Sequence, residues 1–208
     1  MNKKASSFKK QEKLLSTCYE YLILCEIRQP MEKKITLIAI SGSIRPRSSN
    51  EAVIRTAATL VAGKANLIIY EEIRSLPHFD PSPDAEPTQE VVEFRKLLAE
   101  TDGLLISTPE YAFGVPGVLK NALDWTVSSG ELAGKPVAVI TASTSGDKAH
   151  ASLLLTLSAL SARVLEECTL LISFVRSKID SEGNVKDMGT ISAISRLMDT
   201  FINDIRTS

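Results

Sequence analysis

The chain has 208 residues, of which 44% are hydrophobic, and this is enough to bury one sizeable core in a single domain. Its 24 Lys and Arg residues nearly balance its 25 Asp and Glu residues. Bulk charge therefore gives no reason to expect nucleic acid or an anionic membrane as a partner, and small-molecule chemistry is favoured.

The first thirty residues differ in composition from the rest of the chain. The stretch MNKKASSFKK is basic and polar, and the apolar stretch YLILC that follows it is too short to span a bilayer. Acidic Glu20 and Glu26 flank this apolar stretch and no small-x-small cleavage site follows it, so a signal peptide is not indicated. We expect residues 1–30 to be a mobile N-terminal extension and residues 31–208 to form the domain.

Cysteine and histidine are rare, and their spacing gives no sign of a metal site. Cys18, Cys25 and Cys168 show no CxxC or Cys/His pattern, which fits free thiols in a reducing compartment. His78 and His150 lack the partners that a metal site or a catalytic triad needs. The sequence therefore predicts a cytoplasmic protein without a metal.

From Ile35 onward, short apolar runs alternate with longer segments of helical periodicity, the pattern of a parallel sheet covered by helices. The runs are nearly continuous in Val, Ile and Leu, as in strands that are buried on both faces. The expected strands are ITLIAI, NLIIYE, GLLIST, PVAVITA and CTLLIS. The expected helices cover residues 48–61, 87–100, 115–127, 147–162 and 189–205.

Three loops stand out at the carboxyl ends of the expected strands. In five-stranded doubly wound folds, ligands bind beyond these ends, at the switch point beside the first strand. The loops after the first, third and fourth strands read SGSIRPRSSN, TPEYAFGVPG and TASTSGDKAH. A further connection, at residues 75–87, is rich in proline and aspartate, so we expect an exposed loop there.

The first of these loops has the residues of an anion site. Gly42 permits a tight turn, and Ser48 and Glu51 form a capping box at the start of the next helix, whose free amides and dipole favour an anion. Arg45 adds a forked, permanently charged donor group. The alternative is that Ser48 only caps the helix and both arginines of the loop are solvated. The spacing matches neither GxGxxG nor GxxxxGK[ST], which disfavours a dinucleotide fold and a P-loop.

The segments GSIRPRSSN and PEYAFGVPGVLKNALDW together resemble the NADPH-dependent FMN reductases, over roughly residues 34–205. The family motifs have the forms GSxRxxSxN and PEYNxxxPGxLKNAxDW, and both occur here in the right order at strand ends. The resemblance implies a flavodoxin-like α/β three-layer sandwich, with a five-stranded parallel sheet of order 2-1-3-4-5 and helices on both faces. It also implies FMN and NADPH as cofactors.

The resemblance further implies which residues bind the flavin. The phosphate would be held by the side chains of Ser43, Arg45, Ser48 and Asn50, with help from the amides of Ser49 and Asn50. The isoalloxazine ring would lie along the second loop, at Pro109, Glu110, Tyr111, Ala112 and Phe113. Ser143 and Gly146 would contribute from the third loop.

Several positions depart from the family pattern or have two interpretations. Ala112 replaces the more frequent asparagine, so any side-chain hydrogen bond from that position is lost. Lys148 and His150 stand where small residues are frequent; Lys148 either stabilises charge on the reduced ring or is solvated, and we expect His150 to be structural. Tyr111 and Trp125 either stack on the ring or pack within the protein.

The activity that the resemblance implies is hydride transfer from NADPH to FMN, followed by reduction of a small acceptor such as a quinone, an azo compound or free flavin. The flavin N5 carries the chemistry, so no catalytic side chain is expected. Two alternatives are a flavodoxin-like electron carrier without nicotinamide activity and a flavin-free regulator on the same fold. The arginine in the anchor loop and the modest net charge argue against the carrier.

The resemblance also implies a homodimer or a homotetramer. The expected helix that follows Val115 supports this prediction, because it carries apolar side chains around more than one face. These side chains are Leu119, Leu123, Trp125 and Val127.

Overall fold

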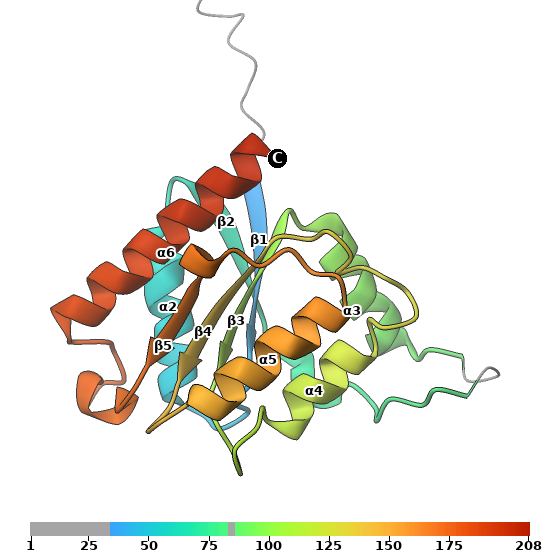
Figure 1. Ribbon diagram of the computed structural model, residues 1–208, viewed down its shortest axis with the longest axis horizontal. Helices are drawn as coiled ribbons and strands as arrows, with labels where there is room; N and C mark the ends of the chain where they lie inside the picture. Colours follow the sequence, from blue (N-terminus) through green and yellow to red (C-terminus); the bar gives the residue numbers. More distant parts are fainter. Residues whose placement is uncertain (1–33, 83–85) are drawn as a thin grey trace, which may run out of the picture. The chain divides into compact units, whose positions relative to one another are not determined.

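The computed structural model describes residues 34–82 and 86–208, so the extension expected at residues 1–30 lies outside the described residues. The described chain is built around one parallel sheet with helices on both faces (Figure 1). The strands are β1 (Ile35–Ser41), β2 (Ala65–Tyr70), β3 (Gly103–Thr108), β4 (Val137–Ala142) and β5 (Thr169–Ile172). Their order is β2-β1-β3-β4-β5, which confirms the expected order.

Helices α2 (Ser49–Leu60) and α6 (Met188–Thr207) cover one face of the sheet (Figure 1). Helices α3 (Gln89–Glu100), α4 (Gly117–Asp124) and α5 (Asp147–Ala159) cover the other. Side chains alternate along each strand between the two cores: in β1, Leu37 packs against α2 and α6, whereas Ile38 packs on the opposite side. Burial of both faces explains why the strands read as unbroken apolar runs.

Three single-turn 3₁₀ helices were not expected from the sequence. They are η1 (Glu72–Ser75), η2 (Glu166–Cys168) and η3 (Val175–Lys178). One turn is too short to produce a hydrophobic period, so pattern analysis does not detect it. The described helices include none with the length and hydropathy of a membrane span.

The sequence suggested that α4 carries apolar side chains on more than one face and could use them in a subunit interface. The structure does not leave these side chains exposed on the helix. Leu119 and Leu123 are fully buried, and Trp125 is only 5% exposed. Val127, which is 59% exposed, follows the end of the helix. The sheet and the 75–82 segment cover the helix, so this argument for a subunit interface is wrong, although it leaves the oligomeric state itself open.

Among the described residues, those from Ile35 onward already build two well-filled hydrophobic cores, one on each face of the sheet. We therefore expect a chain that begins at Met31 to keep its cores and to unfold within a few degrees of the full-length protein. Thermal unfolding followed by circular dichroism measures this. Precipitation or a large fall in the midpoint would instead place residues 22–24 in the core or in an interface.

Candidate functional site

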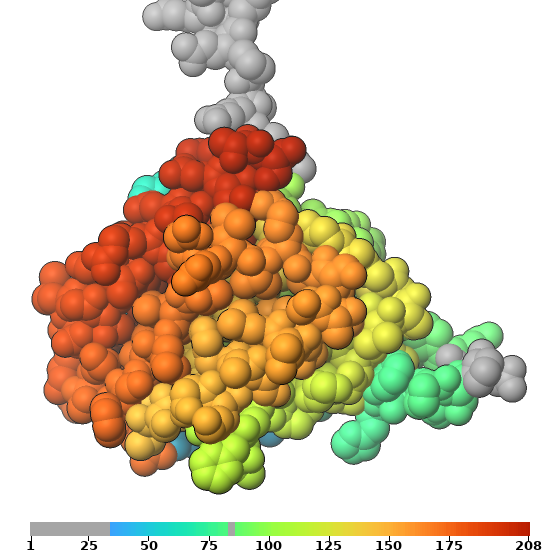
Figure 2. Space-filling model, viewed as in Figure 1, coloured from blue at the N-terminus to red at the C-terminus, as the bar shows by residue number. Residues whose placement is uncertain are grey.

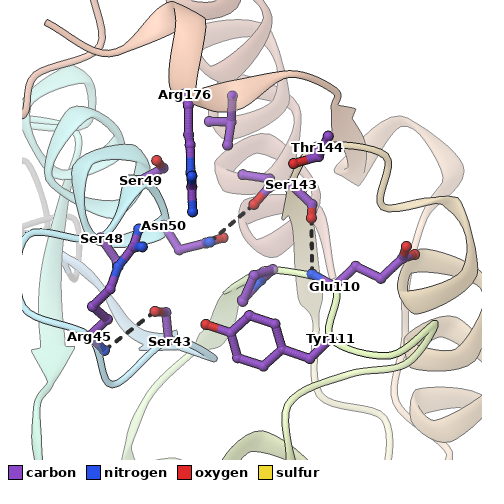
Figure 3. Close-up of a pocket in the computed structure, with 13 residues that line it drawn as sticks. Ser43, Arg45, Ser48, Ser49, Asn50, Glu110, Tyr111, Ser143, Thr144 and Arg176 are labelled. Carbon is purple, nitrogen blue, oxygen red and sulfur yellow. Dashed lines mark hydrogen bonds between the residues drawn. The ribbon is translucent and has the colours of Figure 1, made fainter.

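A cleft lies at the carboxyl ends of the strands and encloses about 530 Å³ of space that opens to solvent (Figure 3). The loops after β1, β3, β4 and β5 all contribute to it. Nine predicted site residues line it: Ser43, Arg45, Ser48, Ser49, Asn50, Pro109, Glu110, Tyr111 and Ser143. The lining residues that the sequence analysis did not select are Ala142, Thr144, Val175 and Arg176.

Gly42 is required for close packing rather than for a left-handed turn. Its backbone N–H donates to Ser107 O at 2.8 Å, which brings the loop against β3. A Cβ atom at this position would lie 2.5 Å from Thr108 Oγ1, and the backbone φ lies outside the left-handed region. The close approach to the neighbouring strand is thus a further reason for a glycine here, beside the tight turn expected from the sequence.

The N-terminus of α2 faces the cleft. Ser48 Oγ accepts a hydrogen bond from the N–H of Glu51 at 3.1 Å, and Ala52 makes the first helical bond to Ser48 O. The amides of Ser49 and Asn50 precede that bond, so they remain donors for an anion. The capping box is only half formed, because the carboxylate of Glu51 pairs with Arg55 one turn later.

The side chain of Asn50 points into the protein. It is 3% exposed; its Nδ2 donates to Ala142 O at 3.1 Å and its Oδ1 accepts from Ser107 Oγ at 2.9 Å. The amide thus joins α2 to β3 and β4 with its polar atoms occupied. What Asn50 offers to a ligand in the cleft is its backbone N–H, whereas the motif alone implied the side chain as well.

The loop after β3 makes a tight hairpin turn. Tyr111 and Gly114 exchange backbone hydrogen bonds of 2.9 and 3.0 Å across it. The two central residues, Ala112 and Phe113, have φ values of 47° and 63°, as in a type I′ turn. Asparagine and glycine suit this conformation and alanine does not, which gives a backbone reason for the asparagine that the family prefers.

This turn projects from the carboxyl edge of the sheet, as the yellow-green segment in Figure 2 shows. Phe113 is 79% exposed and Tyr111 is 54% exposed. Tyr111 lines the cleft, whereas Ala112 and Phe113 lie beyond its lining. The predicted ring-facing residues are therefore divided between the cleft wall and the exposed turn.

Glu110 connects this loop to α5. Its backbone N–H donates to Ser143 Oγ at 3.2 Å (Figure 3). Its carboxylate accepts hydrogen bonds of 2.9 Å from the amides of both Lys148 and Ala149, at the N-terminus of α5. The carboxylate therefore caps a helix that lacks a side-chain cap at its own N-cap residue, Gly146.

The remaining residues of the third loop shape the site without lining it. Gly146 has φ of 99°, and a Cβ atom there would lie 2.8 Å from Leu171 Cδ1. The exposed Lys148 side chain contacts Asp147 at 3.2 Å. His150 Nδ1 lies 2.9 Å from Thr141 Oγ1, and burial lowers the pKa of His150, which favours its neutral form.

The tryptophan and asparagine of the second motif hold the long connection before α3. Trp125 Nε1 and Asn121 Nδ2 donate to Pro77 O at 2.8 and 2.9 Å, and Asn121 Oδ1 accepts from the N–H of Phe79. The ring of Phe79 stands edge-on to Trp125, with centroids 5.2 Å apart. Arg95 lies over the indole at 5.7 Å. Trp125 is therefore a packing residue and not a wall of the cleft.

The donors of this cleft fit a phosphate monoester. The amides of Ser49 and Asn50 begin α2, and serine hydroxyls and the guanidinium of Arg45 lie beside them. The one acidic residue among the lining residues, Glu110, turns its carboxylate toward α5. An anion with several acceptor oxygens can therefore satisfy these donors without meeting a carboxylate.

Comparison with known proteins agrees with this geometry. The profile of the family described as NADPH-dependent FMN reductase matches residues 35–176. A quinone reductase of Escherichia coli is 30% identical over 179 residues, covering 82% of this chain and 95% of that protein. An NAD(P)H-dependent FMN reductase of Pseudomonas aeruginosa is 32% identical over 163 residues, covering 76% and 88%.

A solved flavoenzyme, an NAD(P)H:(acceptor) oxidoreductase from Paracoccus denitrificans, superimposes with a TM-score of 0.74. It is 26% identical in sequence, and the match covers 83% of this chain and 98% of that one. The fold is thus that of the flavodoxin-like flavoenzymes.

The chain belongs to the NADPH-dependent FMN reductase family. It is accordingly an oxidoreductase whose cofactors are FMN and NAD(P)H.

We expect Glu110→Ala to lower the free energy of unfolding by about 1 kcal/mol, because two amides of α5 lose their acceptor. Urea unfolding followed by circular dichroism measures the change. Lys148→Ala is the matched control, since its exposed ion pair should contribute less than about 0.5 kcal/mol. Equal effects of the two substitutions would show that the carboxylate does not stabilise the helix.

Proposed function

We propose that this protein uses FMN, bound in the cleft, to transfer electrons from a reduced nicotinamide to a small quinone or flavin. The observation that carries the proposal is a cleft lined by an arginine, serine hydroxyls and a helix N-terminus at the switch point of a flavodoxin-like sheet, in a chain of the FMN reductase family. FMN when bound supplies the redox chemistry, as a hydride acceptor and an electron donor.

The residues of the first loop would anchor the phosphate. Ser43, Arg45 and the Ser48 region line the cleft together with the amides that begin α2, so both hydrogen-bond donors and positive charge are available. Ser48 Oγ already accepts from the Glu51 amide, which leaves its own proton free to be donated to a phosphate oxygen.

The second and third loops would hold the ring through their backbone and through Tyr111. The hydrogen bond between Glu110 and Ser143 fixes these two loops against each other, so the ring would meet a pre-formed wall. Among the thirteen described residues that line the cleft, none is a histidine, cysteine or lysine. Because FMN when bound supplies the redox chemistry, we assign binding and orientation to these side chains.

For the acceptor we propose a planar quinone. Two curated relatives are named quinone reductase or 2-hydroxy-1,4-benzoquinone reductase. The exposed rings of Tyr111 and Phe113 beside the cleft would offer a flat apolar surface on which such a molecule can stack. Nicotinamide and quinone would then use the same open side of the cleft in turn, which gives ping-pong kinetics.

The test is to load the purified protein with FMN and add NADPH or NADH without oxygen. We expect the visible absorbance of the flavin to bleach and a quinone to restore it. Bound flavin that neither nicotinamide bleaches would favour an electron carrier instead. A protein that binds no flavin would favour a regulator on the same fold.

Arg45→Ala should weaken the binding of FMN more than the binding of riboflavin, because riboflavin lacks the phosphate. A hydrogen bond to a charged group contributes roughly 1.5–3 kcal/mol. The expected loss is about ten- to hundredfold in the dissociation constant for FMN. Flavin fluorescence during titration measures both ligands.

Arg47→Ala is the control for that substitution, because Arg47 belongs to the same loop but does not line the cleft. This substitution should leave the dissociation constant for FMN nearly unchanged. If Arg45→Ala weakened the binding of both flavins equally, or changed neither affinity, the assignment of Arg45 to the phosphate would be wrong.

We also propose that the protein is a homodimer or homotetramer in the cytoplasm. Exposed apolar side chains on other elements support an interface: Val127, Leu155, Leu171 and Phe174. Light scattering at micromolar concentration tests the assembly, and a monomer would refute it. Free, buried Cys168 is compatible with a reducing compartment, and cell fractionation tests the location.

A further inference from the structure

Arg176 belongs to η3, which follows the edge strand β5, and its side chain lines the cleft from that edge of the sheet. Its backbone is held in place on the N-terminal side. Phe174 N–H donates to Thr144 O and Val175 N–H donates to Ser143 O, both at 3.1 Å, and the Val175 side chain is buried. The loop after β4 therefore fixes the position from which the arginine side chain extends.

The side chains of Arg176 and Arg45 approach the same end of α2 from opposite directions. In Figure 3, Arg176 points into the space beside Ser49 and Asn50, and Arg45 extends toward Ser48 from the other side. Arg45 follows the first strand and Arg176 follows the last one, so only the fold brings the two arginines together.

No carboxylate in the described part of the chain neutralises either guanidinium. Two arginines outside the cleft are paired with carboxylates: Arg55 pairs with Glu51, and Arg163 pairs with Asp204. Within residues 34–82 and 86–208, Arg45 and Arg176 form no ion pair with a carboxylate. The only lining acid, Glu110, has its carboxylate on the amides of α5.

Two unpaired guanidinium groups and a helix N-terminus make a strongly positive cleft that suits an anion of more than one charge. A phosphate monoester carries a charge of about −1.5 to −2 at pH 7 and three acceptor oxygens. One guanidinium and the helix end, which carries about half a positive charge, supply about +1.5 and so fall short of a full dianion. A second guanidinium on the opposite side covers the remaining charge.

We propose that Arg176 is a second guanidinium ligand of the FMN phosphate, facing Arg45 across it. The inference rests on the proposed function and adds a residue outside the family's serine-rich motif to the anchor. Its consequence is that the site selects the phosphate dianion, both over riboflavin and over the singly protonated phosphate.

The test compares Arg176→Ala with the wild-type protein in titrations of FMN and riboflavin, followed by flavin fluorescence. We expect the dissociation constant for FMN to rise about ten- to hundredfold and that for riboflavin to stay unchanged. Arg176→Lys should recover only part of the affinity, because an ammonium lacks the planar fork. Lys178→Ala is the matched control on the same turn, since Lys178 lies 3.6 Å from Asp187, and it should change neither constant.

A second readout is the pH dependence of FMN binding. The second phosphate pKa is about 6, so the wild-type affinity should fall as the pH drops through that value. With one guanidinium removed, the preference for the dianion weakens and the curve for Arg176→Ala should be flatter.

An unchanged FMN constant in Arg176→Ala would overturn the inference while leaving the proposed function intact. An equal loss of affinity for riboflavin would also overturn it, because such a loss indicates a structural role. A rise only in the KM for NADPH would overturn it as well, because Arg176 would then contact the nicotinamide dinucleotide. If the wild-type protein bound no flavin, the proposed function would fail first and the inference with it.

Discussion

The buried amide of Asn50 is the contact on which the site depends. Its two hydrogen bonds, to Ser107 on β3 and to Ala142 on β4, fix the start of α2 over the point where the strand order reverses. A buried amide without these partners would cost roughly 1–3 kcal/mol, so the helix has one favourable position. That position directs the free amides of the first turn into the cleft.

The other walls of the cleft are joined to one another in the same way. Ser143 accepts a hydrogen bond from Glu110 through its hydroxyl and from Val175 through its carbonyl, so the loops after β3, β4 and β5 meet at one residue. The carboxylate of Glu110 extends this network to α5. Loops that hold one another need little further ordering when a ligand arrives, which favours tight binding.

The sequence contained enough information for the fold and for most of the cleft. Unbroken apolar runs such as GLLIST reveal buried parallel strands, and the position of Arg45 and Ser48 between a strand and a helix predicts an anion site. The side chains of Asn50 and Glu110 were harder to assign. Their motif positions suggest ligand contacts, whereas their partners lie on strands and a helix that are distant in sequence.

Arg176 could not be found from the sequence, because FVRSK carries no motif and η3 is a single turn. Only the pairing of β5 with β4 brings this segment to the cleft. The left-handed conformation of Ala112 could not be predicted either, because alanine does not favour it and the hairpin imposes it.

The most direct test of this account is the affinity of the wild-type protein for FMN relative to riboflavin, measured by calorimetry at low and high salt. If the cleft recognises the phosphate, FMN should bind about a hundredfold more tightly or better, and the advantage should shrink as salt screens the guanidinium groups. Equal affinities for the two flavins, independent of salt, would contradict the account.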